Sequence, residues 1–186
     1  MRSPKSVRHN GKRVSEIIDA HARFVRGQDG GVRADLGGAN LSRVDFEKAE
    51  LALVNFQGAN LEGANLREAK LSNANLSETN LRGADLRKAD LTETNLHKAD
   101  LTKGQVGGAE LFRANLSDAI LRDADLGVAN LRDADVNGAD FAGANLKATI
   151  LRETKLGGAK LAGADLSTAL LPKGYQASKS QASGHA

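Results

Sequence analysis

"ANLEGANLREAKLSNANL", residues 59–76, places a leucine at every fifth position, with alanine two residues before it and usually asparagine one before it. The leucine-type position continues in steps of five from Leu36 to Leu171, which makes 28 consecutive units. Leucine fills 23 of these positions, phenylalanine three and valine two. The fold must therefore bury an apolar side chain once every five residues.

A period of five fits neither a helix nor a continuous strand. On an α-helix, successive leucines would precess by about 140° and cover every face. On a strand, an odd spacing would send alternate leucines to opposite sides of the sheet. A chain that changes direction every five residues, with a three-residue extended piece and then a corner, buries them all. Four corners close a coil of about 20 residues, so the repeat predicts a solenoid of about seven stacked coils.

The other repeat positions describe the interior and the corners. The residue two before each leucine is alanine in most units, which indicates a narrow interior. The second residue after the leucine is glycine nine times, which suits a turn with positive φ. Lys88 and Val128 occupy the same position, so we expect corners without glycine to adopt the type I class. The predicted structural core includes Leu61, Leu66, Leu71, Leu86, Phe46, Phe56 and Phe141.

The run "ADLRKADLTETNLHKADL", residues 84–101, resembles the pentapeptide-repeat family, whose pattern is A(D/N)LXX. The resemblance covers residues 34–173 and implies an all-β solenoid, a right-handed quadrilateral parallel β-helix. There is also distant similarity to the fluoroquinolone-resistance members of the family. Those members are thought to present an acidic rod that resembles DNA and occupies the DNA-binding surface of gyrase, so the resemblance implies gyrase binding as one possible function.

Four segments are expected. Residues 1–14 are predicted to be a basic flexible leader, 15–33 a capping helix and its connection, 34–173 the β-helix, and 174–186 a flexible tail. "SEIIDAHARFVR", residues 15–26, fits an amphipathic helix with Ser15 as N-cap and His21 in its packed side. We interpret it as a cap over the first coil, with a partner-binding helix as the alternative. Its apolar residues are Ile17, Ile18, Phe24 and Val25.

The sequence shows no catalytic or metal-binding motif. The chain has no cysteine, so it forms no disulfide and no thiolate metal site. Its four histidines lack metal-ligand spacing, and no catalytic residue, cofactor site or metal site is predicted. No stretch approaches the roughly 18 apolar residues of a membrane span. We expect a non-enzymatic cytoplasmic protein without membrane contact.

Binding to another macromolecule is the function that remains. Acids and bases alternate on the outward positions, which argues against a mimic of the closely spaced charges of DNA. The basic N-terminal residues lack interleaved aromatic residues, so nucleic-acid binding is disfavoured. We predict a rigid surface that binds another protein; a gyrase-binding DNA mimic is the alternative, and a structural spacer is a third reading. The candidate interaction residues are apolar departures from the repeat: Leu53, Phe112, Ile120, Ile150 and Leu170.

The C-terminal end has its own apolar pair. Ile150 and Leu170 occupy equivalent positions in successive coils, so they should stack on one face next to Tyr175. Such a patch needs a cover, either the folded-back tail or a second copy of the protein. The resemblance to resistance-type proteins implies dimerisation through this end. A C-terminal homodimer is therefore a further expectation.

Overall fold

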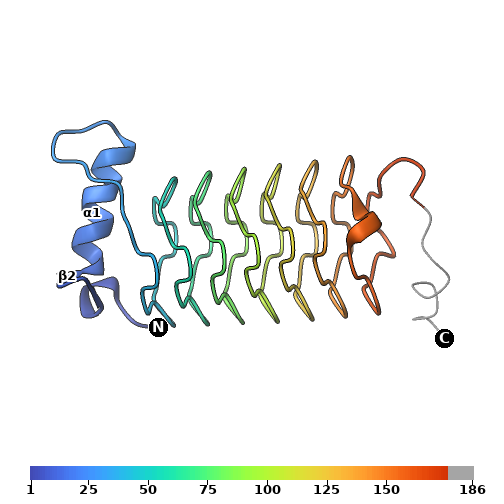
Figure 1. Cartoon of the computed structure of the whole chain (residues 1–186), viewed down its shortest axis with the longest axis horizontal. Coiled ribbons are helices and arrows are strands. Elements are labelled where there is room, and N and C mark those ends of the chain that lie inside the picture. Colours follow the sequence, from blue (N-terminus) through green and yellow to red (C-terminus); the bar gives the residue numbers. More distant parts are fainter. Residues whose placement is uncertain (176–186) are drawn as a thin grey trace.

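The computed structural model describes residues 1–175 and shows a stack of coils with a helix at its N-terminal end (Figure 1). Parallel bridges join outward residues to their equivalents one coil later, from Asp35 and Asn55 to Ile150 and Leu170, and only the bridge from Asp135 to Lys155 is absent from this series among residues 1–175. This coil length follows directly from the five-residue period, because four units close one turn. Each extended piece holds a single bridge residue, so the described coils contain no long strand.

The corners are more uniform than the sequence predicted. At each corner the leucine-type carbonyl accepts a hydrogen bond from the N–H three residues later, as in Ala89 N–H to Leu86 O at 3.0 Å. The residue before that donor has positive φ at every corner from residue 38 to residue 153, including Lys88 at 58° and Val128 at 55°. This is the type II geometry, so the predicted type I corners are wrong. Hydrogen bonds from Lys88 and Val128 to the next coil, at 3.1 and 2.9 Å, hold the backbone there despite its local preference.

The interior is a column of stacked, buried side chains. The seven predicted core residues are all exposed by 2% or less. Where threonine replaces alanine in the repeat, its hydroxyl donates to a main-chain carbonyl, as in Thr94 to Leu71 O at 2.8 Å. No side-chain polar atom buried within residues 1–175 lacks a partner. The buried side chains described therefore combine close packing with satisfied hydrogen bonds.

Residues 1–14 form short regular elements, where the sequence predicted a basic flexible leader. They form η1 (Pro4–Ser6) and a two-stranded antiparallel sheet of β1 (Arg8–His9) and β2 (Lys12–Arg13). Arg2 pairs in parallel with Val44, and the Asp45 N–H donates to Arg2 O at 2.9 Å. The N-terminal segment thus occupies the ladder edge that a preceding coil would cover, because the unpaired main-chain groups there need partners.

Helix α1 (Val14–Val25) lies over the first coil (Figure 1). It starts one residue before Ser15, with Arg13 at the N-cap, because the Glu16 carboxylate accepts the Arg13 N–H at 3.2 Å. Ile17 and Ile18 pack against the core. Phe24 and Val25 are each 37% exposed, so the expectation that they pack against the body is only partly met.

The regular pattern weakens at the C-terminal end. A short 3-10 helix, η2 (Leu156–Gly158), replaces one corner. The sequence predicted inward leucines up to Leu171, but Leu171 is 36% exposed and Leu166 is half-buried, because no described residue packs a further coil over them. Gly174 and Tyr175 are the only described residues of the predicted tail. The rest of that prediction lies outside the described residues.

Candidate interaction surface

Outward side chains stack into columns that run along the rod. In one column the Nδ2 groups of Asn75, Asn95 and Asn115 each donate to the Oδ1 of the asparagine one coil earlier, at 3.2–3.3 Å. The Oδ1 atom of each of these three residues also accepts the N–H two residues later in its own coil. Asparagine and aspartate recur at this position because their short side chains close the turn and link neighbouring coils.

Charged side chains pair between coils and within single corners. Between coils, Lys70 Nζ lies 2.7 Å from Glu50, and Arg82 lies 2.9 Å from Asp100. Within one corner, the Arg87 guanidinium lies beside Asp85, and its hydrogen bond lowers the pKa of that carboxyl despite partial burial. These pairs alternate the sign of the charge along the faces. The surface formed by the described coils therefore lacks the unbroken negative charge of a nucleic-acid duplex.

One carboxylate of these ladders is almost completely buried. The Asp140 side chain is 8% exposed and lies 2.6 Å from Arg122. Burial alone would raise the pKa of Asp140, but hydrogen bonds from the Ala142 N–H and Arg122 outweigh it and lower the pKa. Ile120, which is 39% exposed, precedes Asp140 in the same column and lines a shallow cleft with it.

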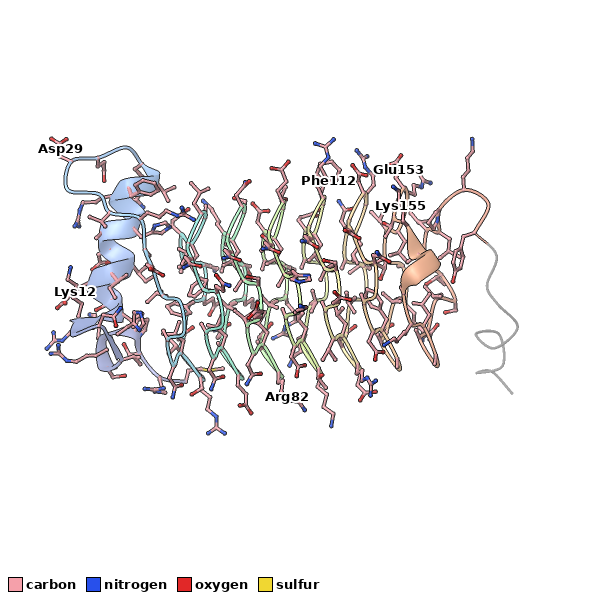
Figure 2. The ribbon with its side chains drawn as sticks, in the orientation of Figure 1. Lys12, Asp29, Arg82, Phe112, Glu153 and Lys155 are labelled. Atoms are coloured by element: carbon pink, nitrogen blue, oxygen red, sulfur yellow. The ribbon has the colours of Figure 1, made fainter. Side chains whose placement is uncertain are left out.

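Phe112 lies on the outer surface of the coils. The sequence predicted an exposed ring, but Phe112 is half-buried beneath two guanidinium groups. The central carbon of Arg113 lies 4.8 Å from the ring centroid, and that of Arg132 lies 5.1 Å away. Figure 2 shows Phe112 on a corner of the rod. The sequence carried the signal for this cover, because Arg132 occupies the same corner position as Phe112 one coil later.

Carboxylates hold both guanidinium groups over the ring. Arg113 Nε lies 3.1 Å from Asp133, and Arg132 Nε lies 3.2 Å from Glu153. The ring and the four charged residues form a cluster, which we call the Phe112 cluster, spanning three coils. Aromatic and arginine side chains are the types that contribute most to protein interfaces.

The other candidate residues are dispersed. Leu53 is 41% exposed and Leu170 is 45% exposed, whereas Ile150 is half-buried. Ile150 and Leu170 pair in the ladder, as the repeat predicted. Leu53 lies on the same side of the rod as Phe112 but three coils away, and Ile120 lies on another face. The five residues therefore do not form one patch.

The described histidines have structural partners. His21 is buried, its Nε2 donates to Ala52 O at 2.8 Å, and its Nδ1 accepts the Ala34 N–H at 3.1 Å. Burial lowers the pKa of His21, and the Arg33 charge adds to this effect against the opposing hydrogen bond to Ala52. Within residues 1–175 no three side chains of His, Asp or Glu gather to hold a metal ion. No helix in that range is long and apolar enough to cross a membrane.

The chain belongs to the pentapeptide repeat family. The family model for pentapeptide repeats matches eight copies, over residues 32–68, 69–103, 109–147 and 129–167. No curated protein matches the chain. Eight repeat copies confirm the interpretation of the five-residue period.

Solved structures with the same repeat are similar to this chain. HetL from Nostoc sp. strain PCC 7120, a protein involved in heterocyst differentiation regulation, is 30% identical, with 76% of this chain and 78% of that chain covered and a TM-score of 0.43. QnrB1, a plasmid-mediated fluoroquinolone resistance protein, is 23% identical, with 75% and 71% covered and a TM-score of 0.66. The likeness to QnrB1 concerns the fold, and it implies a right-handed quadrilateral β-helix for this chain.

Proposed function

We propose that this is a non-enzymatic protein whose rigid rod presents a binding surface to another protein. The observation that carries the proposal is the Phe112 cluster, which places an aromatic ring and two arginines on a scaffold of main-chain hydrogen bonds. Because Asp133 and Glu153 already hold the guanidinium groups, their side chains lose little conformational freedom on binding. The cluster is therefore prepared for association before a partner arrives.

A cross-linking experiment tests this function. Phe112 is replaced by the photoreactive p-benzoylphenylalanine, and the full chain is irradiated in an extract of its native cells. The same label at Val128, an exposed corner residue on a different column, is the matched control. We expect a discrete cross-linked protein at position 112 and none at position 128. Indistinguishable products from the two positions would contradict the proposal.

Binding to gyrase as a DNA mimic is the alternative function. Resemblance to the resistance-type proteins supports it, and the inter-coil pairs of opposite charge, such as Arg82 with Asp100, oppose it. A gyrase supercoiling assay with and without a fluoroquinolone separates the two functions. We expect the protein neither to inhibit supercoiling nor to protect it from the drug. Either effect at low micromolar protein would favour the mimic.

We also propose that two copies associate through their C-terminal ends. Leu170 and Leu171 are exposed there, next to the half-buried Ile150. Light scattering at tens of micromolar protein measures the mass directly, and a monomer would contradict this association. Separately, we propose that the protein lies in the cytoplasm, which cell fractionation tests.

A further inference from the structure

The N-terminal cap, residues 1–33, differs from the coils in how its charges are paired. It contains eight lysine and arginine residues but only three acids. The ten ion pairs found within residues 1–175 all join side chains between Lys48 and Asp165, so none of them involves the cap. The coils therefore neutralise most of their charges internally, whereas the cations of the cap face solvent without a carboxylate partner in the described chain.

Four of these cations lie in and beside the β1–β2 hairpin, at the N-terminal end of α1. The short helix η1 contacts β2, which brings its lysine to the hairpin. We call the four the hairpin patch, and all are exposed: Lys5, Arg8, Lys12 and Arg13. Glu16 is the only acid of residues 1–18, and its carboxylate accepts the Arg13 N–H. Asp35 lines a cleft with Lys12, but donors of the first coils already engage its carboxylate. Figure 2 shows Lys12 at the outer end of the rod.

The hairpin places two arginines directly opposite each other. Arg8 pairs with Arg13 in the antiparallel register. Residues opposite each other in such a pair have Cβ atoms about 5 Å apart, and like charges there are destabilising. Val7 and Val14 are buried and lie on the other side of the alternation, so Arg8 and Arg13 extend away from the body. Two outward guanidinium groups are thus held close together with no counterion among residues 1–175.

The main chain beneath the two arginines is fixed. The Val14 N–H donates to Val7 O at 2.8 Å, and both valines belong to the core. Arg8 Nη1 donates to Gly11 O at 2.7 Å, which holds its guanidinium over the turn. The two like charges therefore cannot separate freely by moving the backbone. An anion between the guanidinium groups would remove the repulsion and accept their hydrogen bonds.

The composition of the hairpin patch distinguishes among polyanions. Single-stranded nucleic acids bind largely by stacking their bases on aromatic rings, and residues 1–14 contain no Phe, Tyr or Trp. A membrane surface favours several large apolar side chains among the cations. Met1 is the exposed large apolar residue at this end, whereas Phe24 and Val25 lie at the other end of α1. A nucleic-acid duplex needs only cations that reach its phosphates.

We propose that the hairpin patch binds the phosphate backbone of double-stranded DNA, independently of base sequence. Arg8 and Arg13 contact phosphate oxygens, and Lys5 and Lys12 flank them. This activity goes beyond the proposed binding of a protein, because it uses the end of the rod and leaves the Phe112 cluster free. A chain that engages both ligands links a partner protein to DNA.

Fluorescence anisotropy of the untagged full chain with a labelled DNA duplex of about 20 base pairs tests the proposal. Two to four phosphate contacts predict a slope of about −1.8 to −3.6 for the logarithm of the binding constant against that of the salt concentration. Arg8→Gln combined with Arg13→Gln should make the slope less steep by about 1.8 and weaken binding at about 50 mM salt at least tenfold. Without DNA, the same variant should melt no earlier than the wild type, because the repulsion is gone.

Lys98→Gln combined with Lys103→Gln is the matched control. Both lysines are exposed corner residues of the coils and form no ion pair within residues 1–175, so this variant loses the same charge elsewhere. It should bind the duplex as the wild type does. Vesicles containing about 30% phosphatidylglycerol should bind the protein more weakly than the duplex at the same salt concentration.

Three results would overturn the proposal: no binding of the duplex at about 50 mM salt, equal losses in the two double variants, or tighter binding to the vesicles. Cross-linking through position 112 does not depend on the hairpin patch, and the variant lacking Arg8 and Arg13 should retain it. The DNA contact and the proposed protein-binding function can therefore fail separately.

Discussion

His21 joins the N-terminal cap to the first coils, and its replacement by phenylalanine tests that connection. The phenylalanine ring is flat and aromatic like the imidazole but slightly larger, and it forms neither hydrogen bond. In the structure, the ring bridges Ala52 O and the Ala34 N–H, which lie near the end and at the start of the first coil. The substitution therefore removes both links and keeps an aromatic ring in this fully buried position.

The cost follows from the burial of the two partners. Ala34 is 2% exposed, so its N–H is left without a hydrogen bond, at a cost of about 1–3 kcal/mol. Ala52 is half-buried and its carbonyl can reach water, so its loss adds about 1 kcal/mol at most. We expect His21→Phe to lower the free energy of unfolding by about 1–4 kcal/mol. Urea unfolding at pH 7.5, followed by circular dichroism, measures this value.

The pH dependence gives an independent check. Because burial lowers the pKa of His21, the unfolded chain binds its proton more readily than the folded chain does. The contribution of neutral His21 to the free energy of unfolding is therefore fully present above about pH 6.5. It declines as the pH falls towards the lowered pKa of His21 in the folded protein. His21→Phe should lack this decline. His97→Phe, on a half-buried corner, is the control and should cost less than about 1 kcal/mol. A wild-type pH profile unchanged by His21→Phe would refute the argument.

Three further substitutions test the core, the Phe112 cluster and a buried carboxylate. Leu86→Asp places a carboxylate in the stack at a fully buried position and should cost more than the roughly 1.5–3 kcal/mol of lost burial, so unaltered thermal melting would refute the inward assignment. Phe112→Ser should change stability by only about 1 kcal/mol, because the ring is half-buried, and should weaken partner binding; a large loss on melting would instead assign Phe112 to the core. Arg122→Ala should destabilise the protein by about 1 kcal/mol at pH 7, a modest value because Arg122 is exposed to solvent. Since Arg122 helps to lower the pKa of Asp140, this loss of stability should become smaller as the pH falls below about 4. Equal losses in urea unfolding at pH 7 and pH 3 would count against the pairing of Arg122 with Asp140.

The period of five was sufficient to predict the coil and the side chains inside it. Counting along the repeat fixes which positions face inward and which are equivalent in successive coils, so the pairing of Ile150 with Leu170 could be predicted without coordinates. The corners could not be predicted in the same way. Val128 has a poor local preference for positive φ, but the hydrogen bonds of two neighbouring coils determine its conformation.

Main-chain pairing explains the remaining errors at both ends. The basic residues of 1–14 have the composition of a solvated leader, but Arg2 joins the ladder through its N–H and carbonyl, which leave no trace in side-chain composition. Lys155 was equally hard to predict. The earlier residues of its column, from Asp35 to Asp135, are all Asp or Asn. Lys160 also departs from Asp and Asn in its own column, yet it keeps its bridge. Residue type alone does not indicate which rung is lost.

The closure of each coil after four repeat units also governs how such a chain can change in length. Deleting four consecutive units from the middle of the rod removes one coil and leaves every downstream column aligned with its upstream part. Deleting a single unit keeps all inward positions filled, but it turns the whole downstream portion by a quarter turn. Small changes in length can thus bring side chains from different faces onto one line, while the interior keeps its composition.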